Sequence, residues 1–291
     1  MIGGRFVLAL ALCLLTTSVS ASEFNFEVGT YKKTRVRLKA SVEKLKLDSA
    51  SWIFRSRING FRDRKHYNGK RDNVLLVPKS TQPDDITLVV WLHGLNGFSE
   101  KTFSRVLSQV KSVSKRGHSV AVVIPEMPWS INTRTKRSRQ GKVWRHTGDF
   151  SQYIGEVKAM LSRWAYHEHS LDLGSVRIAV VGHSAGGSAI NSMAIEGSLC
   201  SVKPEIIVWS DASYGGWLSS AWQNCLRSTS AEIHVLVRKW DKPHSRASTF
   251  MKANPRAAKK IRMQVLDRKR WSHGKIGDNA VDLSSIFQPG C

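Results

Sequence analysis

Long apolar runs are missing from this sequence after its first 21 residues. No later segment offers the roughly 18 consecutive apolar residues that a membrane-spanning helix requires. Internal repeats and low-complexity tracts are also absent, which excludes a solenoid and a compositionally disordered chain. Hydrophobic residues make up 41% of the 291 positions, enough for a substantial buried core in one large domain or two small ones.

Acidic residues are scarce. The chain has 22 Asp and Glu against 45 Lys and Arg, so its formal net charge at pH 7 is +23. A charge of this size favours polyanionic surroundings, which include nucleic acid, anionic lipid headgroups, lipopolysaccharide and acidic cell-wall polymers. If the protein is exported, we expect acidic polymers of the cell envelope as partners rather than nucleic acid. The alternative is that the basic charge reflects a general adaptation to a compartment or lineage. The charge indicates partners and says nothing about chemistry or oligomeric state.

Residues 1–21 have the pattern of a secretory signal peptide. Arg5 precedes an apolar run from Phe6 to Leu15, and small residues that a signal peptidase accepts end the segment at Ala21. The run is too short to span a membrane. We therefore expect cleavage after Ala21 and a soluble mature protein that is exported, either periplasmic or secreted.

Cysteine is rare, with four in the chain and one of them in the leader. The mature chain would keep Cys200, Cys225 and Cys291, and an oxidising compartment permits a disulfide. Cys200–Cys225 is the favoured pair because it closes a short loop around one predicted strand; three unpaired thiols are an equal alternative. No spacing of Cys and His is typical of a zinc site, so the sequence indicates no metal.

Apolar runs rich in Val and Ile follow one another from Asn73 onward and predict buried strands. Between them, 99–116 and 149–166 carry apolar residues at the spacing of an amphipathic helix. This alternation predicts an α/β fold, with a mostly parallel central sheet and helices on both faces, over residues 73–291. For the basic segment 22–72 two interpretations stay open: it forms edge strands, or it is an N-terminal extension packed on the main domain. The predicted strands are 73–78, 86–94, 119–127, 175–184, 205–211, 233–241 and 262–268.

The stretch "VVGHSAGG" places a lone serine, Ser184, between a predicted strand and a predicted helix. It satisfies the pattern G-x-S-x-G, in which small neighbours keep a serine hydroxyl exposed on a tight turn. The helix after it would direct free N–H groups, the first from Ala185, at a reacting oxygen. Upstream, "WLHGLNG" ends another strand with His93 and Gly94, and the N–H of Leu95 is the candidate second donor of an oxyanion hole.

A base and an acid complete the pattern. His273 lies in a loop after the last predicted strand, which is the chain order Ser, acid, His expected of such a site. Asp241 ends the predicted strand 233–241 and Asp211 ends the predicted strand before it, 205–211, so either could orient the imidazole. Sequence alone leaves this choice open.

These residues resemble the α/β-hydrolase fold, and further stretches are similar to a loosely described group of secreted bacterial α/β-hydrolase-like proteins. The resemblance implies a serine hydrolase. In that group the seventh strand tends to end without an aspartate, which favours Asp211, while the presence of Asp241 departs from the pattern. The matching stretches are Asp211-Ala212-Ser213-Tyr214-Gly215, Ser245-Arg246 and His273-Gly274-Lys275-Ile276.

The expected activity is ester or amide cleavage through an acyl-enzyme, with no metal or organic cofactor. The substrate is expected to be an anionic small molecule or a cell-envelope polymer. A peptidase, carboxypeptidase or amidase acting on peptidoglycan would use the same residues. A hydrolase-like scaffold that binds polyanions without catalysis is the third hypothesis.

Substrate contacts are less well defined. Besides His93 and Gly94, Tyr214 and Trp217 follow Asp211 closely enough to line the pocket, or they belong to the core. The loop 128–148 carries several basic residues and no acidic one. It is either a rim that attracts anions, with Trp129 and Trp144 as stacking surfaces, or a solvated loop.

Overall fold

The structure is a computed structural model. It describes residues 51–58, 71–95, 100–127, 129–131, 138–140, 144, 148–284 and 287. The expected signal peptide, Cys291 and most of the basic loop 128–148 lie outside these residues. All of the described residues belong to one compact unit, Tyr31–Cys291.

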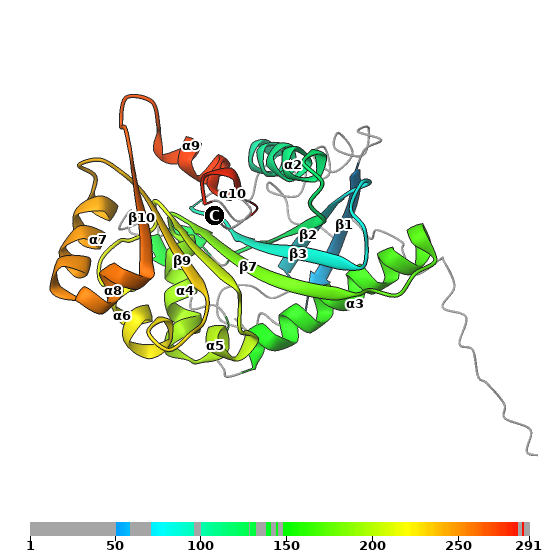
Figure 1. Ribbon diagram of the computed structural model, residues 1–291, viewed down its shortest axis with the longest axis horizontal. Helices are drawn as coiled ribbons and strands as arrows, with labels where there is room; N and C mark the ends of the chain where they lie inside the picture. The colour runs from blue at the N-terminus through cyan, green and yellow to red at the C-terminus, as the bar shows by residue number, and fades with distance from the viewer. Residues whose placement is uncertain are drawn as a thin grey trace, which may run out of the picture. The chain divides into compact units, whose positions relative to one another are not determined.

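A central sheet of eight strands organises this unit, with the strand order β1-β2-β4-β3-β7-β8-β9-β10 (Figure 1). Strand β2 runs antiparallel to both of its neighbours, and every other pair is parallel. A separate antiparallel pair joins β5 (Trp129–Ile131) to β6 (Ser138–Gln140). The eight strands are β1 (Ser51–Ile58), β2 (Arg71–Pro78), β3 (Asp85–Leu92), β4 (Val120–Pro125), β7 (Ser175–His183), β8 (Ile206–Ser210), β9 (Glu232–Arg238) and β10 (Ile261–Leu266).

Helices cover both faces of the sheet, as Figure 1 shows. On one face lie α2 (Glu100–Lys115), α9 (His273–Asp278) and α10 (Ala280–Leu283). The other face is covered by α3 (Asp149–His169), α4 (Gly186–Ile195), α5 (Ser198–Val202), α6 (Trp217–Ala221), the π-helix η2 (Trp222–Leu226), α7 (Lys242–Ala253) and α8 (Pro255–Lys260).

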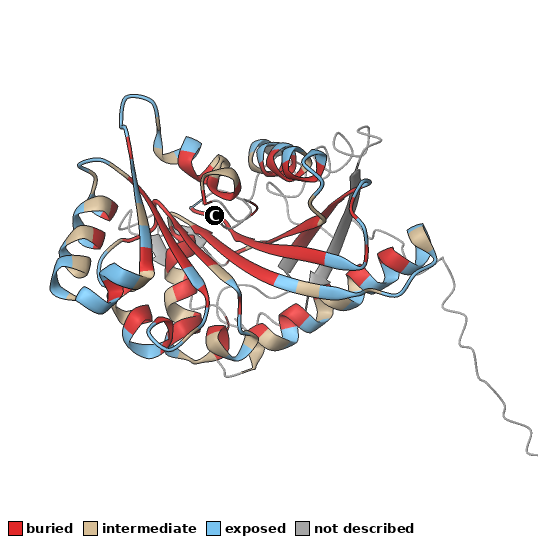
Figure 2. Cartoon of the chain, in the orientation of Figure 1, coloured by how far each residue is buried: buried red, intermediate tan, exposed pale blue. Residues whose placement is uncertain are grey.

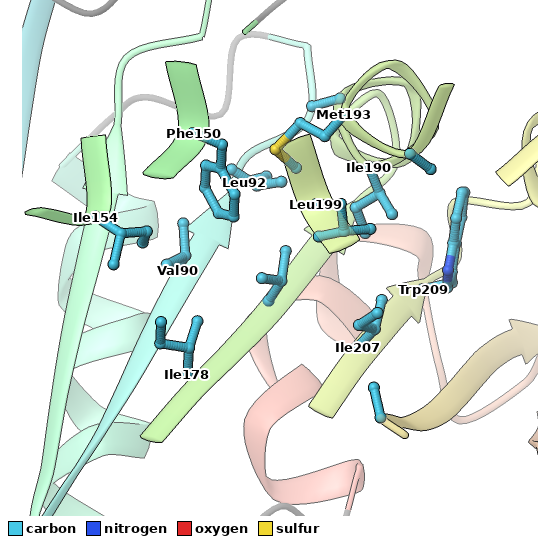
Figure 3. Packing of buried hydrophobic residues seen from close by; sticks show 14 of the residues in the cluster. Val90, Leu92, Phe150, Ile154, Ile178, Ile190, Met193, Leu199, Ile207 and Trp209 are labelled. Carbon is cyan, nitrogen blue, oxygen red and sulfur yellow. The ribbon is translucent and has the colours of Figure 1, made fainter. Parts of the chain in front are cut away.

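Two hydrophobic cores result, one on each face, because successive residues of a strand point to opposite sides. In β3, Val90 belongs to the core with α3 and α4, whereas Val89 belongs to the core with α2. The central strands are accordingly buried along most of their length (Figure 2). Figure 3 shows the larger core, where Phe150 of α3 and Ile190 of α4 pack over β3, β7 and β8.

The predicted fold class is confirmed. Each of the seven apolar runs from residue 73 onward forms a strand of the sheet, and the segments 99–116 and 149–166 form α2 and α3. Within 22–72, residues 51–58 form the edge strand β1, which pairs along its whole length with β2.

A disulfide joins Cys200 of α5 to Cys225 of η2, with a Cα–Cα distance of 5.9 Å. The favoured cysteine pair is therefore confirmed. The bridge closes a loop that contains β8 and the residues that follow it. Among the helices that the structure describes, none is long and apolar enough to cross a membrane.

Candidate active site

Ser184 occupies a strained turn between β7 and α4. Its φ is +53°, a left-handed conformation that is uncommon for a residue with a side chain. Its N–H donates to the carbonyl of Ser210 at the end of β8, at 3.1 Å. The turn is thereby tied to the neighbouring strand, which holds the serine at the carboxyl edge of the sheet, where sheets of this type carry their sites.

The glycines around Ser184 are required by close packing. A Cβ on Gly182 would lie 2.7 Å from Ile190 Cδ1, and one on Gly186 would lie 2.2 Å from the backbone carbonyl oxygen of Leu92. Gly94 of the loop after β3 also faces the turn, where a Cβ would approach Ser184 Cβ to 2.9 Å. A side chain at any of these positions would push the serine out of place.

Asp211 and His273 form a direct pair. Asp211 follows β8 with a φ of +47°, is fully buried, and donates its N–H to the carbonyl of Leu236 at 2.7 Å. The Nδ1–H of His273 donates to Asp211 Oδ2, also at 2.7 Å. His273 is the first residue of α9, and Ser272 caps that helix by accepting from the Lys275 N–H. The imidazole is therefore held from one side by a buried carboxylate and leaves its other nitrogen for a reacting group.

Asp241 has a different partner. Within the described residues its carboxylate forms ion pairs with Arg238, at the end of β9, and with Arg268 rather than with His273. Arg238 Nε also lies 3.7 Å from Asp211 Oδ2, so the guanidinium lies between the two aspartates. The geometry pairs His273 with Asp211 and gives Asp241 the role of partner to Arg238.

Tyr214 reaches into the site from the loop after β8. Its ring centroid lies 6.5 Å from that of His273, and an interaction with the Ser184 side chain slightly lowers its pKa. Burial raises the pKa of Tyr214 to about 12, and the nearby charges of Asp211 and Asp241 act in the same direction. The phenol therefore keeps its proton at physiological pH. Trp217 packs against the Tyr214 ring, with the centroids 5.9 Å apart.

No hydrogen bond joins Ser184 to His273 in the described structure. Such bonds in unliganded enzymes are often long and tighten when substrate binds. The Ser184 hydroxyl can donate a hydrogen bond, and the free nitrogen of His273 can accept it.

The two residues expected to donate to an oxyanion, Ala185 and Leu95, lie beside the Ser184 turn. Ala185 is buried and comes immediately before α4, whose first hydrogen bonds are donated by the N–H groups of Gly187 and Ser188. The N–H of Ala185 therefore comes before the N–H groups that form the first hydrogen bonds of the helix. Leu95 is 39% exposed and follows Gly94, next to the Ser184 turn.

Two residues expected to contact substrate are buried and have partners within the protein. His93 is buried; its Nδ1–H donates to the Gly94 carbonyl at 2.6 Å and its Nε2 accepts the Met127 N–H at 2.8 Å, which joins the loops after β3 and β4. Trp144 was expected to be a stacking surface, but it is 2% exposed and packs within about 5 Å of Phe150 and Tyr153. That expectation is wrong because the indole belongs to the hydrophobic core that contains α3.

His183 and Arg238 are site residues that the sequence analysis missed. Arg238 lies beside Asp211, as above, and His183 donates its Nε2–H to the backbone carbonyl of His273 at 3.0 Å. The signal for His183 was its place inside the G-x-S-x-G motif, next to the serine. Groups of three or more His, Cys, Asp or Glu side chains that could hold a metal ion do not occur in the described part of the chain.

Comparisons with known proteins give a fold and no family. No family model and no curated protein sequence matches the chain. Among solved structures, it is similar to poly(aspartic acid) hydrolase-1 from Sphingomonas sp. KT-1, with 12% identity over 82% of this chain and 99% of that one and a TM-score of 0.50. It is also similar to a ferulic acid esterase (15% identity, the same coverages, TM-score 0.49). A lidless α/β serine hydrolase from Xanthomonas campestris matches at 14% identity over 82% of this chain and 93% of that one, with a TM-score of 0.44. With its mostly parallel sheet covered by helices on both faces, the chain has the α/β-hydrolase fold.

Proposed function

We propose that this protein is an exported serine hydrolase that cleaves an ester or amide bond, with Ser184 as nucleophile, His273 as base and Asp211 as acid. The observation that carries the proposal is the His273–Asp211 hydrogen bond at 2.7 Å, on a fold whose strained turn holds Ser184 nearby. A buried carboxylate on Nδ1 leaves the opposite imidazole nitrogen unprotonated and able to take a proton.

The reaction follows from these positions. His273 takes the Ser184 proton as the serine oxygen forms a bond to the substrate carbonyl carbon, and the N–H groups of Ala185 and Leu95 receive the oxyanion. One such donor contributes roughly 3–4 kcal/mol to transition-state stabilisation. His273 then returns the proton to the departing alkoxide or amine, and the Asp211 carboxylate stabilises the imidazolium. A water molecule cleaves the acyl-enzyme by the same steps and regenerates Ser184.

Labelling with a fluorophosphonate probe tests this directly. The probe phosphonylates an activated serine, so we expect labelling of the mature protein and none of Ser184→Ala. Asp211→Asn should label at least about 1,000-fold more slowly, because the imidazole loses its orientation and its tautomer.

Asp241→Asn is the matched control, since it removes a neighbouring carboxylate that contacts Arg238 and not His273. We expect labelling within about threefold of the wild-type rate. A folded wild-type protein that does not label would contradict the hydrolase proposal and would favour the non-catalytic polyanion binder.

Export and an envelope substrate are part of the proposal. The leader-like residues 1–21 and the Cys200–Cys225 disulfide both suit an oxidising compartment outside the cytosol. Digestion of purified peptidoglycan sacculi, compared with hydrolysis of small acyl esters, distinguishes a peptidoglycan amidase or peptidase from an esterase. Released peptides or amino groups that disappear in Ser184→Ala would identify the former.

A further inference from the structure

We propose that His183 is a positioning residue that keeps the start of α9, which carries His273, in register with Ser184; this inference rests on the proposed function. The Nε2–H of His183 donates to the backbone carbonyl of His273 at 3.0 Å, although the two residues are 90 positions apart. His183 is also the residue immediately before Ser184. One side chain therefore connects the backbone of the nucleophile turn to the backbone of the base.

The His183 ring is held on several sides. Its centroid lies 4.6 Å from that of His273 and 6.2 Å from that of Trp91, which stacks on it at an interplanar angle of 26°. The α9 backbone closes another side, because a Cβ added to Gly277 would lie 2.5 Å from the ring. An imidazole packed this closely has one orientation, so its hydrogen bond fixes where the His273 backbone lies.

The ring has the protonation that this role requires. Burial, with the proximity of His273 acting in the same direction, lowers the pKa of His183 to about 4 against weaker opposite effects from the His273 carbonyl and Asp211. The neutral ring carries one proton, and the bond to a carbonyl places that proton on Nε2.

His273 is thus attached at two points. Asp211 holds its side chain through Nδ1, and His183 holds its backbone through the carbonyl. Loss of the second attachment would let the start of α9 shift while the imidazole stays bound to Asp211. Small displacements of a base from its nucleophile are costly, because rate depends steeply on that geometry.

A pair of substitutions isolates the hydrogen bond. His183→Gln keeps an N–H group at about the position of Nε2, whereas His183→Met has similar length and no donor. With the fluorophosphonate probe we expect His183→Met to label about tenfold more slowly than wild type and His183→Gln to stay within about threefold. Equal loss in both variants, or no loss in His183→Met, would overturn the role of the bond.

Two glycines of α9 provide a second test that leaves His183 in place. Gly277→Ala would push a methyl group into the His183 ring, while a Cβ at Gly274 meets nothing within 4 Å. We expect about tenfold slower labelling for Gly277→Ala and a wild-type rate for Gly274→Ala, with both proteins folded by thermal melting. Equal rates would overturn the inference even if His183→Met does not fold. Absence of labelling in wild type would instead contradict the proposed function itself.

Discussion

Three non-glycine residues with positive φ follow three neighbouring strands. Ser184 (+53°) follows β7, Asp211 (+47°) follows β8, and Trp240 (+67°) lies just after β9. Each such conformation costs on the order of 1–3 kcal/mol and persists only where the surrounding structure enforces it. Two of the three are proposed triad members; the other non-glycine residues with positive φ in the described chain are Trp144, Ser170 and Lys203. Trp240 is 74% exposed, with Lys239 over its ring, at the same edge of the sheet.

At the residue scale, His183 gives the stability of the protein a specific pH dependence. Its pKa is about 4 in the folded protein and 6.5 when unperturbed. Above pH 6.5 it is neutral in both states and contributes nothing. As pH falls toward 4, the unfolded chain binds a proton that the folded protein does not, so the free energy of unfolding falls, by about 2 kcal/mol at pH 5.

Urea unfolding at pH 7 and pH 5 measures this loss. His183→Gln cannot titrate, so we expect it to lose about 2 kcal/mol less than wild type over the same interval. Identical losses in the two proteins would show that His183 does not titrate in this range when the chain unfolds.

At the scale of the elements, the disulfide constrains the segment that carries the proposed acid. Cys200 and Cys225 are 25 residues apart, and the loop between them contains β8, Asp211 and Tyr214. Closing a loop of this length removes about 3 kcal/mol of chain entropy from the unfolded state. The bridge therefore stabilises the region in which a buried carboxylate must stay in place.

Replacing both cysteines with serine should lower the free energy of unfolding by about 3 kcal/mol, measured by urea denaturation. Added reductant should bring wild type close to the double variant and leave the double variant unchanged. A double variant as stable as oxidised wild type would contradict a stabilising role for the bridge.

At the scale of the whole molecule, the charge of +23 and one polar groove suggest how an anionic substrate would be attracted. A groove of about 750 Å³ lies between α2 and α9–α10, and its lining includes Ser272 and Gly274, the two neighbours of His273. Lys101, Arg105 and Lys275 also line it, against the carboxylates Asp278 and Asp282. Arg105 is paired with Asp278, whereas Lys275 Nζ donates to the Arg270 carbonyl and lies over the Trp271 ring.

The kcat/KM for an anionic ester should therefore fall about tenfold as NaCl rises from low to high concentration, while that for a neutral ester of equal size changes little. Lys101→Gln combined with Lys275→Gln should reproduce part of this loss for the anionic ester alone. Equal salt dependence for both esters would contradict electrostatic attraction of the substrate.

Residue patterns determined much of this protein. Apolar runs and their spacing specify the strands and the helices α2 and α3, because burial of a strand or a helix face depends on neighbours within a few positions. The G-x-S-x-G turn is also local: its glycines and its strained serine are consecutive. These features could be predicted without knowing what packs against them.

Only the tertiary structure decided which groups meet. Asp211 and Asp241 each follow a strand of the sheet, and the choice between them depended on where α9 places His273, 62 residues beyond Asp211. Asp241 forms an ion pair with Arg238 and does not contact His273 among the described residues. The role of His183 likewise depends on a carbonyl 90 residues away and on the absence of a side chain at Gly277. Contacts of this kind join residues far apart in the chain, so they cannot be predicted from composition or from local spacing.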